Sequence, residues 1–576
     1  MKSIVAVSLA VVLLASCVSA SKAPVYDLLI RNAYVYDGSG GAPFRGEVAV
    51  SGDRIAYVGP QAPGAGRAVI DAGGKAVSPG FINMLSWATE SLIVDGRGLS
   101  DLKQGVTLEV MGEGTSMGPL SPEMKRLAIQ RMGDIKFPIE WTTLDEYLAS
   151  LERRGISLNV ASFIGAATAR EHVLGEGDVD PTPEQLLAMR RLVVEAMEDG
   201  AMGVGSSLIY APASYAETPE LTALATEAGR CGGIYISHVR SEADRLLEAV
   251  DELIEISRLS GAPAEIYHLK AAGRANWGKL DAAIAHIETA RAKGQRITAD
   301  MYNYTAGSTG LDAAMPPWVQ AGGVEAWIGR MKDPATRAKV LAEMRHDKPG
   351  FENLYRHAGA EGTLLVGFKN PALKTLTGKT LAEVAKDRGV SPEDAAIDLV
   401  IEDGSRVQVV YFLMSEANVK RQTALPWMSF GSDAAAQAPE GVFMKSSTHP
   451  RAYGNVARLL GKYVRDEKAT SLQSAIHRLS SLPAKNLGLK DRGLLKAGYF
   501  ADVVVFDPVT VGDHGTYEAP KQFATGVTHV VVNGAVALAD GEPTAARAGK
   551  VVRGRAWKGW ADGGCRPTAK DWSWAW

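Results

Sequence analysis

The middle of the chain alternates between short apolar segments and longer amphipathic segments, and this alternation constrains the fold more than any other feature. Helical patterns, such as those of residues 182–199 and 241–260, lie between the apolar segments. Eight strand–helix units in one run predict an α/β fold, a (β/α)8 barrel of the TIM type, which we place at residues 78–489. The predicted strands are residues 76–84, 107–112, 158–164, 203–206, 233–237, 264–267, 297–301 and 427–431.

Strand-like segments also occupy both ends of the chain. Residues 25–77 and 490–555 combine β-branched and aromatic runs with glycine and aspartate at the turns. They predict one small β-sandwich built from both chain ends. The connection between the seventh and eighth barrel strands, residues 305–426, is far too long for a simple loop, so we expect an inserted helical subdomain there.

Residues 556–576 form a tryptophan-rich tail. Packing of the tail onto the body of the protein, or a contact between subunits, is the simpler explanation of these side chains. Contact with a membrane surface is the alternative. The tryptophans of the tail are Trp557, Trp560, Trp572, Trp574 and Trp576.

Residues 1–20 predict an export signal. Lys2 supplies a positive start, and residues 4–15 form an apolar run that is too short to span a bilayer. The sequence Leu-Ala-Ser-Cys that ends at Cys17 resembles a bacterial lipobox, in which the cysteine is lipidated after cleavage. Secretion with cleavage after Ala20 is the alternative. We therefore expect an exported, periplasmic protein that is anchored to the membrane by lipid on Cys17, and no transmembrane helix.

Composition argues against two classes of protein. Lysine and arginine number 62 and aspartate and glutamate 65, so the net charge is -3 and there is no basic excess for a nucleic acid. The chain has three cysteines, and only Cys231 and Cys565 lie outside the export segment. Two cysteines cannot form a disulfide framework, and a single bridge between them is left open.

Two histidines lie at the ends of neighbouring predicted barrel strands. The fifth strand leads through Ile234 and Ile236 to His238, which share one face because side chains alternate along a strand. The sixth strand ends in the same way at His268. Since active sites of barrels lie at the C-terminal ends of the strands, both imidazoles could reach one metal ion, and zinc commonly binds such ligands.

Acidic residues end two further strands. Asp433 follows the eighth strand, where it could bind metal or act as a general base, or cap the helix that follows. Glu113 lies at the upper end of the second strand, where it could complete a set of two histidines and one carboxylate. A plain turn residue before Gly114 is the alternative for Glu113.

Taken together, these features resemble the amidohydrolase superfamily and, within it, the D-aminoacylase or N-acyl-D-amino-acid deacylase family. The resemblance extends over residues 25–550, including the insertion. Its further motifs are Pro79-Gly-Phe-Ile82, Gly105-Val-Thr107, His268-Leu-Lys-Ala-Ala-Gly273, Trp277-Gly-Lys279, Ala306-Gly-Ser-Thr309, Gly431-Ser-Asp433, His449-Pro-Arg-Ala-Tyr-Gly454 and the strand from Gly498 to Pro508.

The chain departs from the family pattern at two strands. The first strand of the family continues as Asp-x-His-x-His, whereas this chain has Leu85 and Trp87 in place of the histidines. The second strand of the family carries a zinc-binding cysteine, and here Glu113 stands in the corresponding Gly-Glu-Gly. The resemblance therefore implies one complete metal site, formed by Glu113, His238 and His268, and about one zinc ion per chain.

The resemblance also implies a reaction and its residues. Asp433 would act as the general base in hydrolysis of an amide. Lys270, Tyr302 and Arg451 would contact a substrate carboxylate, and Ser308 and Tyr210 are weaker candidates for the same task.

The expected function is a zinc-dependent amidohydrolase that removes the acyl group from N-acyl amino acids of D configuration. Hydrolysis of dipeptides or other amides at the same site is one alternative. A non-catalytic binding protein on a degenerate barrel is the other, and the loss of the two strand-one histidines favours it. Retention of His238, His268, Asp433 and Arg451 favours the enzyme.

Overall fold

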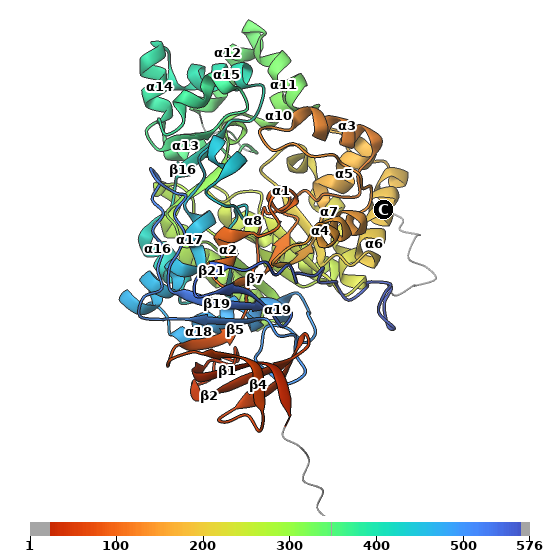
Figure 1. Cartoon of the computed structure of the whole chain (residues 1–576). Helices are drawn as coiled ribbons and strands as arrows, with labels where there is room; N and C mark the ends of the chain where they lie inside the picture. The colour runs from red at the N-terminus through yellow and green to blue at the C-terminus, as the bar shows by residue number, and fades with distance from the viewer. Residues whose placement is uncertain (1–23, 347, 349, 566–576) are drawn as a thin grey trace, which may run out of the picture.

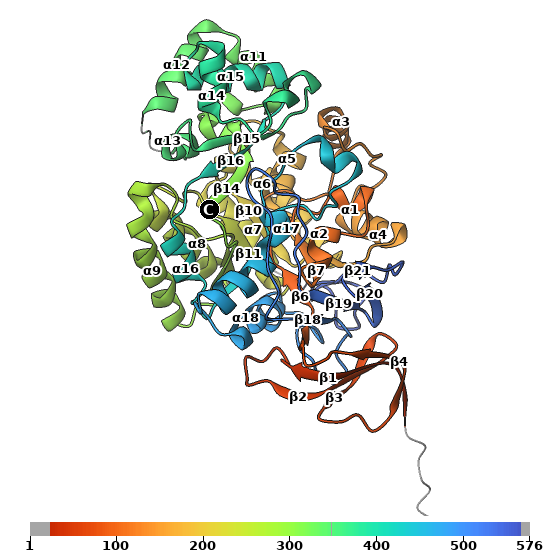
Figure 2. The same cartoon turned by 60° about the vertical axis from the view of Figure 1, so that its left-hand side comes forward.

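The barrel forms the centre of the molecule, between a β domain at one end and the insertion at the other (Figures 1 and 2). The computed structural model describes residues 24–565 except positions 347 and 349. The barrel strands are β6 (Phe81–Asn83), β7 (Val106–Met111), β8 (Asn159–Ser162), β9 (Ile164–Gly165), β10 (Gly203–Ser207), β11 (Ile234–His238), β12 (Ala264–Ile266), β13 (Ile297–Met301) and β17 (Met428–Phe430).

These strands are parallel and close into a barrel. They pair in the order β6-β7-β8 and β9-β10-β11-β12-β13-β17, and only Phe163 separates β8 from β9. The first and last strands meet where the amide of Met84 donates to the carbonyl of Phe430 at 3.1 Å and where Ser86 pairs with Ala434. The predicted (β/α)8 barrel is thereby confirmed.

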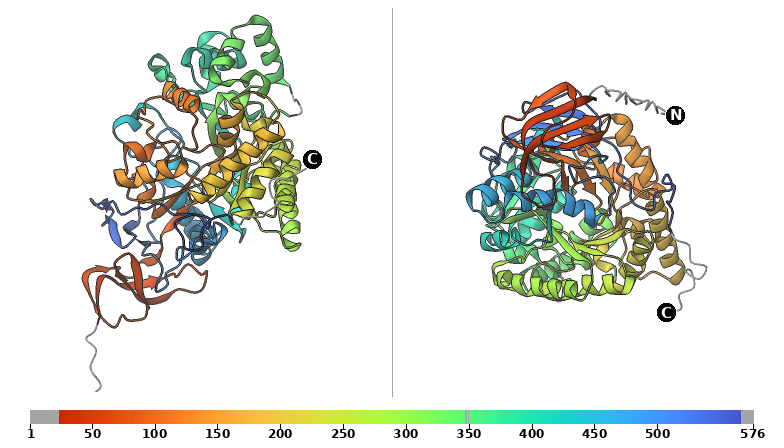
Figure 3. Two further views of the ribbon diagram at one scale, coloured as in Figure 1. Left: turned by 90° about the vertical axis from the view of Figure 1, so that its right-hand side faces the viewer. Right: turned by 90° about the horizontal axis from the view of Figure 1, so that it is seen from below.

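Helices surround the barrel, as the view from below shows (Figure 3). The long helix predicted at residues 182–199 is α6. Thr182 caps its N-terminus, where the side chain of Thr182 accepts a hydrogen bond from the amide of Gln185. The helix predicted at residues 241–260 is shorter than expected, because Ser241 and the amide of Glu242 bind the Glu352 carboxylate and keep residues 241–245 in a loop. The helices before β13 are α1 (Ser91–Val94), α2 (Leu99–Leu102), α3 (Pro122–Arg131), α4 (Leu144–Arg154), α5 (Ala166–Leu174), α6 (Pro183–Glu198), α7 (Thr218–Arg230), α8 (Leu246–Ser260) and α9 (Leu280–Ala292).

The first predicted strand, residues 76–84, belongs to two sheets. Its first half, β5 (Ala76–Pro79), pairs antiparallel with β18 of the β domain, and its second half is β6 of the barrel. Gly80 separates them, and a Cβ at this position would lie 2.1 Å from Thr107 Oγ1. Close packing at Gly80 thus lets the chain pass from one domain to the other.

The β domain combines strands from both chain ends around one apolar core. The first strand, β1, pairs with β2 and β4 along most of its length and with β5 at Tyr34 and Val35, so it links the two parts of the domain. The core contains Ile30, Val48 and Val503. The strands of this domain are β1 (Val25–Val35), β2 (Phe44–Ser51), β3 (Arg54–Gly59), β4 (Ala65–Asp71), β5, β18 (Val503–Phe506), β19 (Val527–Val532), β20 (Ala535–Ala539) and β21 (Glu542–Pro543).

The insertion has a core of its own, built around residues such as Trp327, Leu399 and Tyr411. Three antiparallel strands, in the order β14-β16-β15, connect it to the top of the barrel. Its elements are β14 (Ala306–Gly310), α10 (Pro317–Gln320), α11 (Gly323–Met331), α12 (Pro334–Arg345), α13 (Leu354–Ala358), β15 (Thr363–Gly367), α14 (Leu381–Arg388), α15 (Pro392–Asp403), β16 (Gln408–Phe412) and α16 (Glu416–Gln422).

Helices after β17 complete the ring, and the chain then returns to the β domain. A π-helical turn, Leu459–Asp466, continues α17. The three helices are α17 (Arg451–Arg458), α18 (Leu472–Leu479) and α19 (Ser481–Asn486).

The end of the described chain is tied to the barrel. Cys565 forms a disulfide with Cys231, which follows α7, so the bridge left open by the sequence is present. The amide of Lys558 donates to the carbonyl of Glu198 at 3.0 Å. The rings of Trp557 and Trp560 pack edge to face, with centroids 5.0 Å apart. This part of the predicted tail therefore packs against the body, while its last three tryptophans lie outside the described residues.

No helix within the described ranges is both long and apolar enough to cross a membrane. The predicted export signal and Cys17 lie outside those ranges.

The barrel interior can be tested at Ile236, which is fully buried among the inward-facing residues of neighbouring strands. We expect Ile236→Ala to destabilise the fold by about 2–5 kcal/mol, because it leaves a cavity in a closely packed core. Thermal unfolding measures this effect. Val94→Ala is the control, since Val94 is 45% exposed, and equal losses for both variants would contradict the packing described here.

Candidate metal centre and active site

The C-terminal ends of the barrel strands open into a cavity of about 640 Å³. The insertion covers one side of it with residues of β14 and β16. All nine site residues predicted within the described chain line this cavity: Glu113, Tyr210, His238, His268, Lys270, Tyr302, Ser308, Asp433 and Arg451. The barrel thus brings together residues that are more than 300 positions apart in the sequence.

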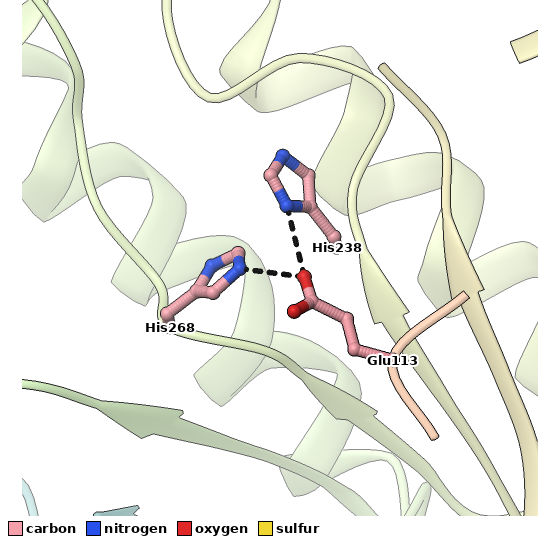
Figure 4. A group of neighbouring side chains, drawn as sticks. All are labelled: Glu113, His238 and His268. Atoms are coloured by element: carbon pink, nitrogen blue, oxygen red, sulfur yellow. Dashed lines mark hydrogen bonds and ion pairs between the residues drawn. The ribbon is translucent and has the colours of Figure 1, made fainter. Parts of the chain in front are cut away.

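The Glu113 carboxylate lies between two imidazoles (Figure 4). Its Oε1 atom is 3.1 Å from Nδ1 of His238 and 3.0 Å from Nε2 of His268. All three side chains are buried. The rings of the two histidines lie edge to face, with centroids 4.5 Å apart. Three potential ligand atoms therefore converge on one point at the barrel mouth.

Glycines allow Glu113 to reach this position. Gly112 has a φ of +105°, and a Cβ there would lie 2.5 Å from the carbonyl oxygen of Phe163. Gly114 has a φ of +68°, and a Cβ there would lie 2.4 Å from the Cβ of Ser207. Only glycine fits both the backbone conformation and the space on either side of Glu113.

Positive φ angles also occur at His268 (+35°) and Asp433 (+48°), at the ends of their strands. Such conformations are strained in residues with a side chain, and they persist where surrounding contacts enforce them. The amide of His268 donates to Asp300 at 2.9 Å, and the amide of Asp433 donates to the carbonyl of Leu85 at 2.9 Å. Hydrogen bonds to neighbouring strands thus hold both residues in place.

Glu242 forms an outer carboxylate that the sequence analysis missed. Its Oε1 lies 3.0 Å from Nδ1 of His268, and its Oε2 lies 3.7 Å from Nε2 of His238. These are the ring nitrogens that point away from Glu113. A carboxylate in this position fixes the proton of a metal-binding histidine on its outer nitrogen and leaves the inner nitrogen free. The only sequence signal was an acidic residue four positions after His238.

The charges of the cluster stabilise one another. Burial raises the pKa of Glu113, but the two histidines outweigh burial and hold that pKa below its usual range. Burial also opposes ionisation of Glu242, yet His238, Lys270 and His268 hold its pKa well below the usual range. Burial lowers the pKa of His268, whereas the two carboxylates raise it to about 10. A metal on His268 would therefore have to displace a proton, so that metal affinity rises with pH.

The residues fit a metal ion. The donor atoms of Glu113, His238 and His268 all lie within 4.8 Å of one another. Two imidazoles and one carboxylate form a ligand set that zinc commonly uses in catalytic sites, where a fourth position stays open. On the outer side of the cluster, Nε2 of His238 has no hydrogen-bond partner among the described residues. Glu242 Oε2 lies 3.7 Å from this nitrogen, beyond hydrogen-bond distance.

Asp433 lies beside the cluster and has a partner at each oxygen, one hydrogen bond and one ion pair. Trp87 Nε1 donates to Oδ1 at 3.0 Å, and Arg451 Nη2 pairs with Oδ2 at 2.9 Å. Burial raises the pKa of Asp433, although Arg451 opposes this effect. The helix-cap alternative is wrong, because Asp433 precedes no helix directly: a 3-10 helix begins at Gly441 after Glu440, and α17 begins at Arg451 after Pro450.

Arg451 has N–H groups that no described residue satisfies. Its guanidinium lies 4.4 Å from the ring centroid of Tyr302, and its Nε and Nη1 atoms are buried without a hydrogen-bond partner in the described chain. Buried N–H groups of this kind cost free energy unless a ligand accepts their hydrogen bonds. The arrangement therefore favours binding of an anionic ligand by Arg451, next to the ring of Tyr302.

Lys270 contacts the outer side of the cluster. Its ammonium pairs with Glu242 and lies 2.8 Å from Nδ1 of His268. It also lies 5.4 Å from the ring centroid of Tyr302, on the cavity wall. Lys270 is thus held in place by Glu242, and its predicted contact with a substrate carboxylate stays a prediction.

Ser308 and Tyr210 complete the set of predicted residues on the cavity wall. Ser308 Oγ donates to the carbonyl of Val409 at 2.9 Å. The Tyr210 ring packs edge to face on His238, with ring centroids 5.3 Å apart, and the Arg406 guanidinium lies 5.0 Å from the Tyr210 centroid. Arg406 is a further cavity residue that the sequence analysis missed, and Asp312 pairs with it at 2.7 Å.

Comparison with known proteins defines the class. The profile of the Amidohydrolase family matches residues 68–538, which include the barrel, the insertion and the returning strands β18 and β19 of the β domain. The chain therefore belongs to the Amidohydrolase family. This finding confirms the family and the class of metal-dependent amidohydrolase predicted from the sequence.

Within this family, the chain is most informatively compared with deacylases. The N-acyl-D-glutamate deacylase of Alcaligenes xylosoxydans xylosoxydans is 32% identical over 530 residues, which cover 92% of this chain and 96% of that enzyme. A D-aminoacylase structure, described in terms of one-metal activation and second-metal attenuation, gives a TM-score of 0.76 at 30% identity. The N-acyl-D-glutamate deacylase of Bordetella bronchiseptica, solved with zinc and a phosphonate mimic of the tetrahedral intermediate, gives 0.74 at 29%. Both structures cover 92% of this chain and are themselves covered completely.

The role of the outer carboxylate can be tested with Glu242→Gln. We expect metal affinity to fall about 10- to 100-fold, because an amide is a weaker acceptor for the outer N–H of a metal-binding histidine. Metal content after dialysis against graded chelator concentrations measures the change.

Glu265→Gln is the matched control, because Glu265 is also a buried carboxylate of the barrel. It accepts hydrogen bonds from the hydroxyls of Thr298 and Ser429, and burial raises its pKa. Equal metal affinity in wild-type protein and Glu242→Gln would contradict the proposed role of Glu242.

Proposed function

We propose that this protein hydrolyses the amide bond of N-acyl amino acids of D configuration and releases a carboxylate and the free amino acid. One observation carries the proposal: the metal-ligand cluster and the Asp433–Arg451 pair face the same cavity. A metal held by the cluster could activate an amide for hydrolysis. Within the pair, Asp433 could transfer a proton and Arg451 could bind an anion. The similarity to D-amino-acid deacylases supports the D configuration.

We propose one zinc ion per chain, held by Glu113, His238 and His268. When bound there, the metal would polarise the amide carbonyl and lower the pKa of a water molecule. Leu85 and Trp87 offer no metal-binding atom, so the two positions that carry histidines in the family pattern cannot supply a second site.

The residues of this chain would then act as follows. Arg451 would bind the carboxylate of the amino acid through its unpaired N–H groups, and the ring of Tyr302 would support the guanidinium. Asp433 would accept the proton of the attacking water at a carboxylate oxygen and pass it to the leaving amine. The raised pKa of Asp433 suits this double task, because the group must both accept and release a proton.

Hydrolysis of dipeptides at the same site uses the same residues and differs only in the acyl group. A non-catalytic binding protein is the second alternative. The loss of two family histidines favours binding alone, whereas the complete ligand cluster beside Asp433 favours catalysis. Comparing N-acyl-D-amino acids, their L counterparts and dipeptides as substrates separates these alternatives.

The proposed base can be tested with Asp433→Asn. Asparagine tolerates a positive φ and keeps the size of the side chain, but it cannot accept the proton. We expect a folded protein that still binds metal and whose turnover of N-acyl-D-amino acids falls about 10²- to 10⁴-fold. Steady-state kinetics, together with metal analysis, measure the effect.

Asp540→Asn is the matched control, because Asp540 also has a positive φ (+50°) and its side chain is 94% exposed. Near-normal turnover of Asp433→Asn would rule out Asp433 as the base. Absence of turnover in the wild-type protein would support the binding alternative.

We also propose that the protein is exported and anchored by lipid on Cys17. The disulfide between Cys231 and Cys565 supports an oxidising compartment. The strand β1 begins at the end of the molecule opposite the insertion (Figure 1), so an anchor before it would leave the cavity facing away from the membrane.

Anchoring can be tested with Cys17→Ser. We expect the variant to move from the membrane fraction to the soluble fraction, because a serine cannot receive the lipid that holds the protein at the bilayer. Cell fractionation and immunoblotting measure the distribution. A wild-type protein that is already soluble would instead support secretion with cleavage after Ala20.

A further inference from the structure

We propose that the indole N–H of Trp87 takes the place of a second metal ion at this site. By bridging Glu113 and Asp433, it positions the proposed base and restricts the site to one metal. This inference rests on the proposed function for the role of Asp433. It goes beyond that function in assigning Trp87 as a positioning residue.

The bridge consists of one donor and two carboxylates. Trp87 Nε1 lies 3.0 Å from Oε2 of Glu113 and 3.0 Å from Oδ1 of Asp433. Glu113 uses its other oxygen, Oε1, for the two histidines. The indole thus joins the metal-ligand cluster to the proposed base through the one carboxylate oxygen of Glu113 that does not face the imidazoles.

The backbone fixes both ends of this bridge. The chain beyond β6 pairs with the chain beyond β17, where Ser86 lies opposite Ala434. The amide of Trp87 donates to the carbonyl of Ala434 at 3.0 Å, and the amide of Asp433 donates to the carbonyl of Leu85 at 2.9 Å. Trp87 and Asp433 are therefore held side by side at the seam that closes the barrel.

The chemistry of the indole suits this place. Two neighbouring carboxylates repel each other, and the charge of Glu113 raises the energy of an ionised Asp433. A cation between them would relieve the repulsion. The indole N–H relieves it in part as a hydrogen-bond donor, but the nitrogen has no lone pair with which to bind a metal. Its proton points into the space that a second cation would need.

The other substituted position offers no metal-binding atom. Leu85 is fully buried in the barrel interior. Its Cβ lies only 2.6 Å from the place that a Cβ of Gly431 would take. Leu85 therefore packs closely on Gly431 in the barrel interior, and Trp87 is the residue of the two that contacts Glu113 and Asp433.

A role of Trp87 as a wall of the substrate cavity is the competing explanation, since its side chain is 38% exposed and lines that cavity. Trp87→Phe separates the two roles, because phenylalanine keeps an aromatic wall and lacks the N–H group. Trp87→His provides the opposite test, because it offers a nitrogen lone pair between the two carboxylates.

The experiment measures metal content and kinetics on the same preparations. Wild-type protein, Trp87→Phe and Trp87→His are dialysed against excess zinc and then against buffer, and bound zinc is determined by elemental analysis. The kcat and KM for N-acetyl-D-amino acids are then measured. We expect one zinc in the wild type and in Trp87→Phe, and two in Trp87→His. In Trp87→Phe we expect kcat to fall about 10- to 100-fold with little change in KM, because a hydrogen bond to the base is lost.

Trp318→Phe is the matched control. Its indole also donates to a carboxylate, Glu343 at 2.8 Å, but lies in the insertion and outside the cavity wall. We expect one zinc and wild-type kinetics for this variant.

Three results would overturn the inference. They are two zinc ions in the wild type, one zinc in a folded Trp87→His, or a Trp87→Phe whose loss lies in KM alone. A wild-type protein without deacylase activity would refute the proposed function, and the zinc counts would still decide whether Trp87 excludes a second metal.

Discussion

The site depends on the contact of one buried carboxylate, Glu113, with two imidazoles. A lone carboxylate at this depth would be strongly destabilised, and the histidines compensate for its burial. Glu242 in turn contacts the outer nitrogens of both rings and is stabilised by Lys270. Each buried charge of the cluster is therefore compensated by a neighbouring charge of opposite sign. The loss of one member would leave its partners buried without compensation, which explains why so many ionisable side chains can lie together at the mouth of the barrel.

Closure of the barrel adds a second constraint. The first and last strands meet at a seam that continues beyond both strands, and this seam carries Trp87 on one side and Asp433 on the other. Any residue at position 87 must therefore lie near the proposed base. In the family pattern a histidine stands there, and in this chain the same backbone presents an N–H donor. Position 87 of this chain thus offers the proposed base an N–H donor and no metal-binding atom.

Much of this arrangement follows from the sequence, and the rest depends on the tertiary fold. Alternation along one strand places His238 at the barrel mouth, and the strand–helix repeat predicts that His268 lies beside it. Glu242 could not be predicted, because it belongs to a loop that is fixed by Glu352 of the insertion and resembles the start of a helix. The role of Trp87 could not be predicted either. Its sequence position indicates only a missing ligand, and the bridge exists only once the barrel is closed.

The balance of charge connects metal binding to substrate choice. Around the cavity, the carboxylates of Glu113, Glu242 and Asp433 face the cations of Lys270 and Arg451. A proton on His268, whose pKa is raised to about 10, brings this group to neutrality. A divalent metal held in place of that proton would give the site one more net positive charge. An anionic substrate would then restore the balance, and the unpaired N–H groups of Arg451 could bind its carboxylate. The metal would therefore prepare the cavity for an N-acyl amino acid as well as for the hydrolysis of its amide.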